Sequence, residues 1–247
     1  MCTFLFAWQV FSDAPIVVAA NRDERLDRPS NPPSIIDEDP RVIAPRDVEA
    51  GGTWIGYNEH RVLVAVLNRW TDANLRGERS RGLLVADALD CESTEEAAAT
   101  VEQSTDEYEY EGFNLVVADA EDSLLYEWDG ELRKTVFNPG VHVVVNIGGD
   151  ERFDIPESRP ELGRAQADNT QRARNDLQPE TDETAEAWRE RAATVLRDHD
   201  YGFCVHHGQF GTRSSSLISI YDDGTVDESF ADGPPCETDY ETVDVSL

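Results

Sequence analysis

Short apolar runs of strand length alternate along this chain with polar turns, and amphipathic helical segments lie between groups of these runs. At the start, the runs 2–11 and 16–20 flank a polar stretch at 12–15, a pattern that predicts a β-hairpin. The second run leads directly into Asn-Arg-Asp-Glu at 21–24, so we expect the strand to end there. Because four polar residues at the end of a buried strand are costly unless they are paired or functional, this tetrapeptide is a candidate site.

The same kind of pattern predicts the remaining elements. A stretch rich in proline and charge at 25–50 is expected to be a long ordered loop, and long loops often carry function. Ser93 and Glu96 form a capping box that should begin a helix, and Asp129-Gly130 suits a hairpin turn. Strands are predicted at 51–56, 61–67, 113–118, 123–128, 131–137, 141–145, 212–220 and 225–230, and helices at 80–89, 93–103 and 181–197.

The order of these elements is strands, helices, strands, one helix and strands, without the regular alternation of strand and helix that a parallel sheet needs. This order predicts an α+β fold in which two mainly antiparallel sheets are covered by helices. A length of 247 residues fits a single domain spanning 1–247. The tail after about residue 231 carries no basic residue and is expected to be mobile.

The composition is strongly acidic, with 51 Asp and Glu against 21 Lys and Arg, a formal net charge of -30 at pH 7 and one lysine, Lys134. A field of this sign repels nucleic acid and anionic membranes, so neither is an expected partner. An acidic surface almost free of lysine is typical of a protein that works in concentrated salt, where screening removes most self-repulsion. Docking to a basic partner is the alternative, although the carboxylates spread along the whole sequence instead of clustering.

The sequence also bears on location and on metals. Its first basic residue is Arg22 and no apolar run reaches the length of a membrane span, so we expect a cytoplasmic protein without a span. The adjacent His206 and His207 would point to opposite faces of a strand, which disfavours a shared metal. Neither a C-x-x-C nor a histidine at ligand spacing accompanies the cysteines, which argues against a disulfide framework and a structural zinc site. No metal or other cofactor is predicted. The four cysteines are Cys2, Cys91, Cys204 and Cys236.

Cys2 follows the initiator methionine and opens the first predicted strand. If Met1 is removed, Cys2 carries both a thiol and a free α-amino group, so nucleophile and base belong to one residue. The ordinary pKa of an α-amino group, about 7.7–8.0, lies near neutrality and close to the pKa of a thiol, about 8.5. This is the chemistry of an N-terminal nucleophile hydrolase. The alternative is that Cys2 is a small core residue in an apolar strand.

Several short segments in a fixed order form a more specific pattern than any one of them. They are Cys2, Asn21-Arg-Asp-Glu24, Gly51-Gly-Thr-Trp54, Leu67-Asn68, Ser80-Arg-Gly82, Val145-Asn146 and Gly211-Thr-Arg-Ser-Ser215. Together they resemble the NRDE family, also called the transport and Golgi organisation 2 family, from residue 2 to about residue 220. That family is similar in turn to the choloylglycine hydrolases and penicillin V acylases, which are N-terminal cysteine amidases. The resemblance implies an N-terminal nucleophile hydrolase-like four-layer αββα sandwich.

The resemblance also implies a set of site residues. Cys2 would be the nucleophile, and Asp23 would hold its terminal ammonium and thiol. Asn68 and Asn146 would donate hydrogen bonds to the oxyanion, and Arg213 would add charge stabilisation. The expected substrate contacts are Asn21, Arg22, Glu24 and Trp54.

Each of these residues has a structural alternative. Asp23 and its neighbours would then form a buried polar network that holds the long loop. Asn68 and Asn146 would be turn residues. Arg213 would pair with an acidic surface group, and Trp54 would belong to the core.

The sequence departs from the hydrolase pattern at Ala20, where those enzymes have an arginine. Arg22 lies two residues further along and would project from the same strand face. Two functions stay open. The first is a cysteine hydrolase that cleaves a linear amide or thioester bond of a small-molecule substrate through an acyl-Cys2 intermediate. The second is a non-catalytic carrier or chaperone of a hydrophobic ligand such as haem or an acyl chain.

Overall fold

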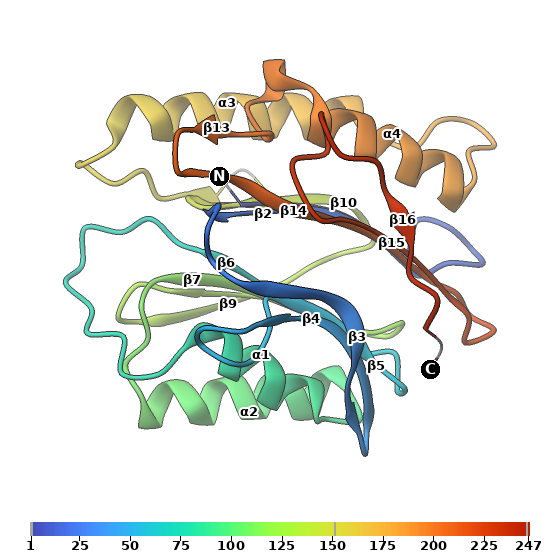
Figure 1. Cartoon of the computed structure of the whole chain (residues 1–247), viewed down its shortest axis with the longest axis horizontal. Coiled ribbons are helices and arrows are strands. Elements are labelled where there is room, and N and C mark those ends of the chain that lie inside the picture. The colour runs from blue at the N-terminus through green and yellow to red at the C-terminus, as the bar shows by residue number, and fades with distance from the viewer. Residues whose placement is uncertain (1, 151, 246) are drawn as a thin grey trace. The chain divides into compact units, whose positions relative to one another are not determined.

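The apolar runs form two antiparallel sheets in the computed structural model, and two α-helices pack on each sheet among the residues that the structure describes (Figure 1). Those residues are 2–150, 152–245 and 247. The chain divides into two compact units, Met1–Arg28 with Pro139–Asp244, and Pro29–Asn138 with Val245–Leu247. Each sheet lies within one unit.

The sheet of the first unit is built around the opening hairpin, which confirms the predicted strands there. β1 pairs with β2 on one side and with β10 on the other, so that Thr3 lies between Asn21 and Val145. The strand order is β12-β11-β10-β1-β2-β14-β15-β16, and β13 pairs with β14. The strands are β1 Thr3–Trp8, β2 Ile16–Arg25, β10 Gly140–Val145, β11 Gly148–Gly149, β12 Arg152–Phe153, β13 His206–His207, β14 Phe210–Ile220, β15 Val226–Ala231 and β16 Glu241–Thr242.

Helices α3 (Pro160–Asp176) and α4 (Ala185–Arg197) pack on this sheet, α3 against β10 and α4 against β2 and β14. The hydroxyl of Thr184 caps α4 by accepting a hydrogen bond from the backbone amide of Ala187 at 3.2 Å. α4 buries Trp188, whose ring nitrogen donates to the carbonyl of Leu177 at 2.8 Å. A short 3-10 helix, η1 (His199–Tyr201), follows α4.

The second unit holds a sheet in the order β3-β4-β5-β6-β7-β8-β9. Its strands are β3 Ser30–Glu38, β4 Arg41–Asp47, β5 Ile55–Asn58, β6 Leu63–Asn68, β7 Phe113–Ala118, β8 Ser123–Trp128 and β9 Leu132–Val136. Helices α1 (Arg81–Leu89) and α2 (Thr94–Glu107) pack on it. The predicted cap of α2 is confirmed, because the amide of Glu96 donates to the hydroxyl of Ser93 at 3.3 Å. Tyr110, Phe113 and Tyr126 are fully buried in the core between these helices and the sheet.

The boundary predicted after residue 20 is wrong. Residues 21–24 lie inside β2, which continues to Arg25 because it pairs with β14 over this length. The strand partner therefore satisfies the backbone of the polar tetrapeptide, which the sequence pattern could not reveal.

The loop predicted at 25–50 is also wrong, because most of this stretch forms the hairpin of β3 and β4. β3 contains Pro32 and Pro33, which cannot donate to a strand ladder. It tolerates them because it is an edge strand and its pairing with β4 is interrupted between Asn31 and Ser34.

Helix α3 was not predicted, because the stretch before residue 181 reads as a polar loop. The residues that α3 buries are Gly163, Gln166, Thr170 and Ala173, so the helix has no large apolar stripe. The other predicted strands and helices are present, but the strand predicted at 51–56 begins only at Ile55 and the helix predicted from 181 begins at Ala185.

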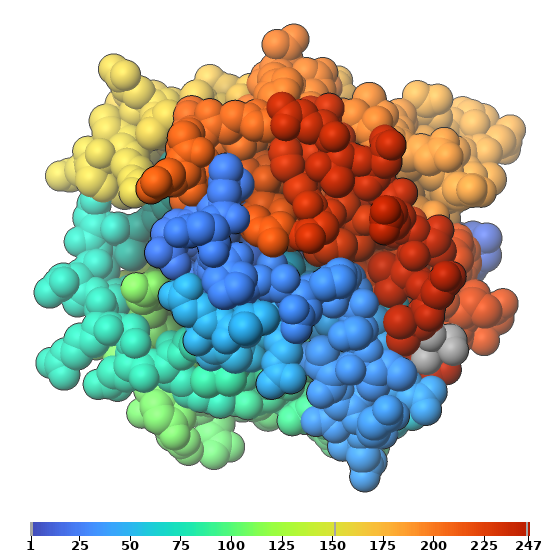
Figure 2. Space-filling view, viewed as in Figure 1, coloured from blue at the N-terminus to red at the C-terminus, as the bar shows by residue number. Residues whose placement is uncertain are grey.

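The tail after residue 231 contacts the rest of the first unit. β16 pairs with β15, and the hydroxyl of Tyr240 lies 2.8 Å from that of Ser215. Figure 2 shows this tail, in red, on the surface against the segment drawn in orange. How mobile the tail is stays a prediction. No helix within the described residues combines the length and the apolar character that crossing a membrane requires.

Candidate active site

Cys2 lies directly before β1 at one end of the central strands of the first unit. Its neighbour Thr3 pairs with both Asn21 and Val145. Only 8% of Cys2 is exposed. The backbone amide of Asp23 donates to Cys2 Sγ at 3.3 Å, and Cys2 Sγ lies 3.6 Å from the carbonyl oxygen of the same residue. The thiol is therefore buried against a polar strand segment.

The carboxylate of Asp23 is held from the neighbouring strand. Thr212 lies opposite Asp23 in the register of β2 and β14, and its hydroxyl donates to Asp23 Oδ1 at 2.7 Å. The same hydroxyl accepts a hydrogen bond from the amide of Val205 at 2.9 Å. Asp23 and Thr212 are 2% and 1% exposed, so this chain of hydrogen bonds is shielded from water. Thr212 belongs to the Gly-Thr-Arg-Ser-Ser segment, but nothing in that segment assigns it a role.

The other residues of the tetrapeptide have different surroundings. The amide of Asn21 donates to the carbonyls of Leu196 at 3.2 Å and Phe203 at 2.9 Å, so it ties β2 to the end of α4 and the segment after it. Arg22 is buried on β2. Glu24 is half-buried and pairs with Arg28 at 3.4 Å. The substrate-binding roles of Asn21, Arg22 and Glu24 stay predictions.

Asn146 directly follows β10. Because Thr3 pairs with Val145, extending the register by one residue brings Asn146 beside Cys2 at the same edge of the sheet. The side-chain oxygen of Asn146 accepts a hydrogen bond from the amide of Gln166 at 3.2 Å, and both residues are buried. This bond directs the side-chain oxygen of Asn146 towards Gln166 of α3, and the role of Asn146 as an oxyanion donor stays a prediction. Gln166 lies in the helix that the sequence did not predict.

Arg213 is the extra residue of a β-bulge, because the register of β2 and β14 shifts between Thr212 and Ser214. Bulges redirect side chains out of the regular alternation. Its guanidinium pairs with the carboxylate of Asp232, which is 56% exposed. The surface ion pair considered for Arg213 is therefore present, and its role in charge stabilisation stays a prediction.

Asn68 and Trp54 belong to the second unit. Asn68 is the last residue of β6. The next residue, Arg69, has a side chain that is 1% exposed, and it donates to Asn114 and Glu127 at 2.8 Å each. These bonds fix the chain where Asn68 leaves the strand. Trp54 is half-buried, and its carbonyl accepts from the amide of Val66 at 2.8 Å.

Two of the short segments that resemble the family, 51–54 and 80–82, are hydrogen-bonded to each other in the second unit. The amide of Thr53 donates to the carbonyl of Gly82 at 3.1 Å. A Cβ on Gly52 would lie 2.2 Å from that same oxygen, so only glycine fits there. Gly51 and Gly52 have φ of 68° and 73°, so the start of the strand predicted at 51–56 is a turn and β5 begins only at Ile55. The segments 51–54 and 80–82 thus have a structural explanation independent of chemistry.

The fold is that of the N-terminal nucleophile hydrolases. A solved structure with this fold, the Caenorhabditis elegans N-acylethanolamine-hydrolyzing acid amidase ortholog, has a TM-score of 0.57 and 12% sequence identity. The match covers 88% of this chain and 92% of that chain. The predicted α+β class with two antiparallel sheets is therefore confirmed.

Comparison of the amino-acid sequence with known families identifies the family of this chain. The model of the family Transport and Golgi organisation 2 matches residues 1–229, and the chain belongs to this family. The Transport and Golgi organization protein 2 homolog of Bos taurus is 29% identical over 233 residues, which cover 85% of this chain and 84% of the relative. The homolog of Mus musculus is 30% identical over 139 residues, which cover 53% and 50%.

Proposed function

We propose that this protein is an N-terminal cysteine hydrolase that cleaves a linear amide or a thioester bond of a small-molecule substrate through an acyl-Cys2 intermediate. The observation that carries the proposal is the contact between Asp23 and Cys2, in which a backbone amide donates to Sγ at 3.3 Å. A cysteine that only fills the core behaves as a small hydrophobic residue and does not require a polar partner. Here the thiol contacts the backbone of Asp23, whose buried carboxylate Thr212 in turn holds, and this polar arrangement suits a reacting group.

In the proposed reaction the α-amino group, freed by removal of Met1, takes the thiol proton. The thiolate attacks the substrate carbonyl carbon, a C–S bond forms, and the carbonyl electron pair moves to oxygen. Asn146 and, as the resemblance implies, Asn68 donate to this oxyanion. Its collapse breaks the C–N bond of an amide or the C–S bond of a thioester, and the leaving group takes the proton. Water then hydrolyses the thioester on Cys2, which releases the acid and restores the thiol.

The name of the structural neighbour supports the choice of substrate class. That protein is described as hydrolysing N-acylethanolamines, which are linear acyl amides. We therefore propose that the substrate of this chain carries an acyl group on a non-peptide nitrogen or on sulfur. The acyl chain and the leaving group are left for the experiment to determine.

One observation favours a second function, a carrier of a hydrophobic ligand such as haem or an acyl chain. Ala20 stands where the related hydrolases have an arginine, and an alanine cannot supply charge to a reaction centre. Arg22, two residues further on β2 and therefore on the same face, is the candidate replacement. The carrier would use the same fold without forming a bond to Cys2.

The first test is the intact mass of the purified protein. Loss of Met1 is expected, because the proposed base would otherwise be locked in a peptide bond. Retention of Met1 on all molecules would overturn the mechanism.

The second test compares wild type, Cys2→Ala and Cys91→Ala on a panel of N-acylethanolamines, other acyl amides and acyl thioesters at high salt. Cys91 lies in the second unit and has no role in the mechanism, so Cys91→Ala is the matched control. We expect turnover and a trapped acyl adduct on Cys2 in wild type and Cys91→Ala, and neither in Cys2→Ala. Equal turnover by all three proteins would refute the role of Cys2. Saturable haemin binding by all three without turnover would support the carrier instead.

A further inference from the structure

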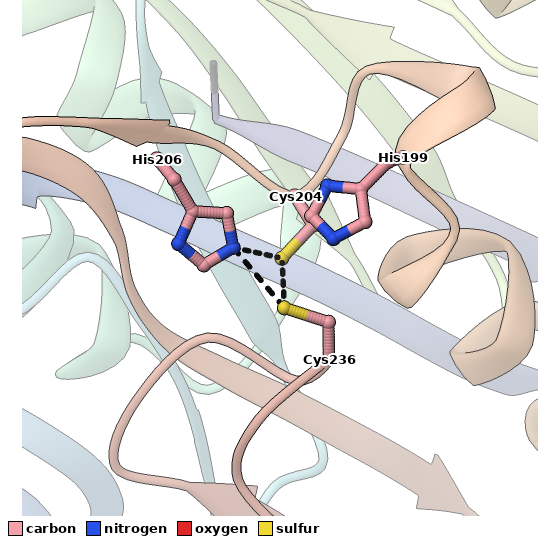
Figure 3. Close-up of side chains that lie close together, drawn as sticks. All are labelled: His199, Cys204, His206 and Cys236. Atoms are coloured by element: carbon pink, nitrogen blue, oxygen red, sulfur yellow. Dashed lines mark hydrogen bonds between the residues drawn. The ribbon is translucent and has the colours of Figure 1, made fainter.

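Two cysteines and two histidines from separate segments of the first unit converge at one place (Figure 3). His199 begins η1, Cys204 follows that helix, His206 begins β13, and Cys236 lies in the tail between β15 and β16. One potential ligand atom from each lies within 4.8 Å of those of the other three. None of these side chains takes part in the proposed hydrolysis.

The distances match those of a tetrahedral metal site. Cys204 Sγ and Cys236 Sγ are 3.3 Å apart, and His206 Nε2 lies 3.1 Å from Cys236 Sγ and 3.7 Å from Cys204 Sγ. Tetrahedral Zn²⁺ has Zn–S distances of about 2.3 Å and Zn–N distances of about 2.0 Å, which separate its ligand atoms by roughly 3.3–3.8 Å. The three measured distances therefore need only small adjustments around a central ion.

His199 completes the set. Its ring centroid lies 5.3 Å from that of His206, and the two ring planes are inclined by 39°. Cys204 is buried, Cys236 is half-buried and both histidines are exposed, so an ion can enter from solvent. Two sulfur and two nitrogen donors suit Zn²⁺ and disfavour Mg²⁺ and Ca²⁺, which prefer oxygen ligands.

We propose that His199, Cys204, His206 and Cys236 bind one Zn²⁺ ion. Binding exchanges two thiol protons, released to solvent, for two Zn–S bonds, while each imidazole donates a lone pair without losing a proton. Four protein ligands leave no open position, so the site is structural. We expected no metal because the cysteines and histidines do not lie at metal-binding spacings along the sequence. In the structure the ligands converge although Cys204 and Cys236 are 32 residues apart in the sequence.

The proposed site would connect two parts of the first unit. Cys236 belongs to the tail, whereas Cys204 precedes Val205, whose amide donates to the hydroxyl that holds Asp23. The carbonyl of Val205 also accepts from the amide of Thr212 at 2.9 Å. Zn²⁺ bound here would fix the tail to the segment that supports Asp23. The metal site does not depend on the proposed hydrolysis, and its test does not use activity.

The test is metal binding by the full chain, reduced and stripped with a chelator. Zn²⁺ is titrated against a chromophoric competitor, and Co²⁺ serves as a spectroscopic substitute. We expect one ion per chain and, with Co²⁺, the thiolate charge-transfer and visible bands of tetrahedral coordination. Loss of a residue that only supports a metal ligand weakens metal binding by ~10–100-fold. Cys236→Ser and His206→Ala each remove a ligand, so each should weaken Zn²⁺ binding by more than this. His207→Ala and Cys91→Ser are the matched controls and should bind as wild type.

Three outcomes would overturn the proposal. They are no binding tighter than that of a Cys204→Ser/Cys236→Ser variant, equal binding by His206→Ala and His207→Ala, and a Cys204–Cys236 disulfide that persists in excess reductant. Binding that disappears at high salt would identify diffuse attraction to the acidic surface, because screening weakens such attraction but not coordination. Because Cys204 is buried, circular dichroism checks that the variant with Cys204→Ser folds. Cys236→Ser and His206→Ala change less buried side chains, so the test does not depend on that variant. Limited proteolysis should cut the tail faster in the stripped protein and in Cys236→Ser than in Zn²⁺-loaded wild type.

Discussion

The hydroxyl of Thr212 donates a 2.7 Å hydrogen bond to the carboxylate of Asp23, and the amide of Asp23 donates to the thiol of Cys2 at 3.3 Å. Thr212 of β14 is thus linked to the candidate nucleophile through one residue, Asp23, whose carboxylate accepts from Thr212 and whose backbone amide donates to Sγ. Sequence motifs alone assign Thr212 no role. Its hydrogen bond makes Thr212 a candidate positioning residue for the Asp23 carboxylate.

We predict that Thr212→Val slows alkylation of Cys2 by iodoacetamide and lowers turnover, each by up to about 100-fold, because the carboxylate loses its fixed orientation. Thr212→Ser keeps the hydroxyl and should stay close to wild type. Peptide mass spectrometry across a pH series measures alkylation of Cys2, with Cys91 as an internal reference. Equal losses in the Val and Ser variants would contradict the prediction, because Thr212→Ser keeps the hydroxyl and should then keep the function.

Gln166 acts on a different part of the site, because its amide donates to Asn146 at 3.2 Å. We predict that Gln166→Leu lowers kcat for acyl transfer but leaves the alkylation rate of Cys2 unchanged, since only the oxyanion donor loses its support. Gln166 is fully buried, so the variant should also lose about 1–3 kcal/mol of unfolding free energy. Urea titration measures this loss. A parallel fall in alkylation would mean that the whole sheet edge had shifted.

Arg213 and Asp232 offer a matched pair for the charge role that the resemblance implies. Their ion pair has an exposed carboxylate, and such surface pairs contribute about 0–1 kcal/mol to stability. Asp232→Asn should therefore change neither the unfolding free energy nor turnover by a measurable amount. Arg213→Gln should leave stability equally unaffected and reduce turnover by at least 10-fold. Unchanged turnover in Arg213→Gln would contradict the role in charge stabilisation and would leave the ion pair with Asp232 as the explanation for Arg213.

The sequence predicted the parts of the fold whose apolar pattern is local. The β1–β2 hairpin and the cap at Ser93 follow from neighbouring residues, and both are present. Helix α3 was missed because Gly163, Gln166 and Thr170 form a buried face without large apolar side chains. Elements that depend on a partner elsewhere in the chain carry no such local pattern.

The same distinction applies to the candidate site. Cys2 and Asp23 could be proposed from motifs, because each segment is recognisable by itself. Thr212 could be assigned only from the register of β14 with β2, which sets it opposite Asp23. Cys204 and Cys236 are too far apart in sequence for any spacing rule to join them.

Gly51 and Gly52 allow the cost of backbone conformation to be separated from the cost of steric overlap. Both have positive φ, so an alanine at either position should lose about 1–2 kcal/mol of unfolding free energy. A Cβ on Gly51 would lie 3.8 Å from Leu83 Cδ2, an ordinary contact, whereas on Gly52 it would lie 2.2 Å from the carbonyl oxygen of Gly82. We predict that Gly52→Ala unfolds at much lower urea than Gly51→Ala. Equal midpoints would mean that the turn and the start of α1 move apart easily.

The net charge of -30 leads to a prediction about salt. The Debye length falls from about 10 Å at 0.1 M salt to about 3 Å at 1 M, so self-repulsion of the folded chain weakens over this range. The Tm should therefore rise steeply with KCl. The exposed residues Asp106, Glu131 and Glu190 allow a direct test, because changing all three to lysine reduces the net charge from -30 to -24.

The triple variant should have a higher Tm than wild type at low salt and a smaller gain with added KCl, because it begins with less repulsion to screen. Differential scanning calorimetry at matched KCl concentrations measures both quantities. The reverse order of the two salt slopes would contradict a role for repulsion and would favour specific ion binding at particular carboxylates. A Tm independent of KCl in both proteins would rule out concentrated salt as the reason for the acidic surface, leaving a basic partner as its explanation.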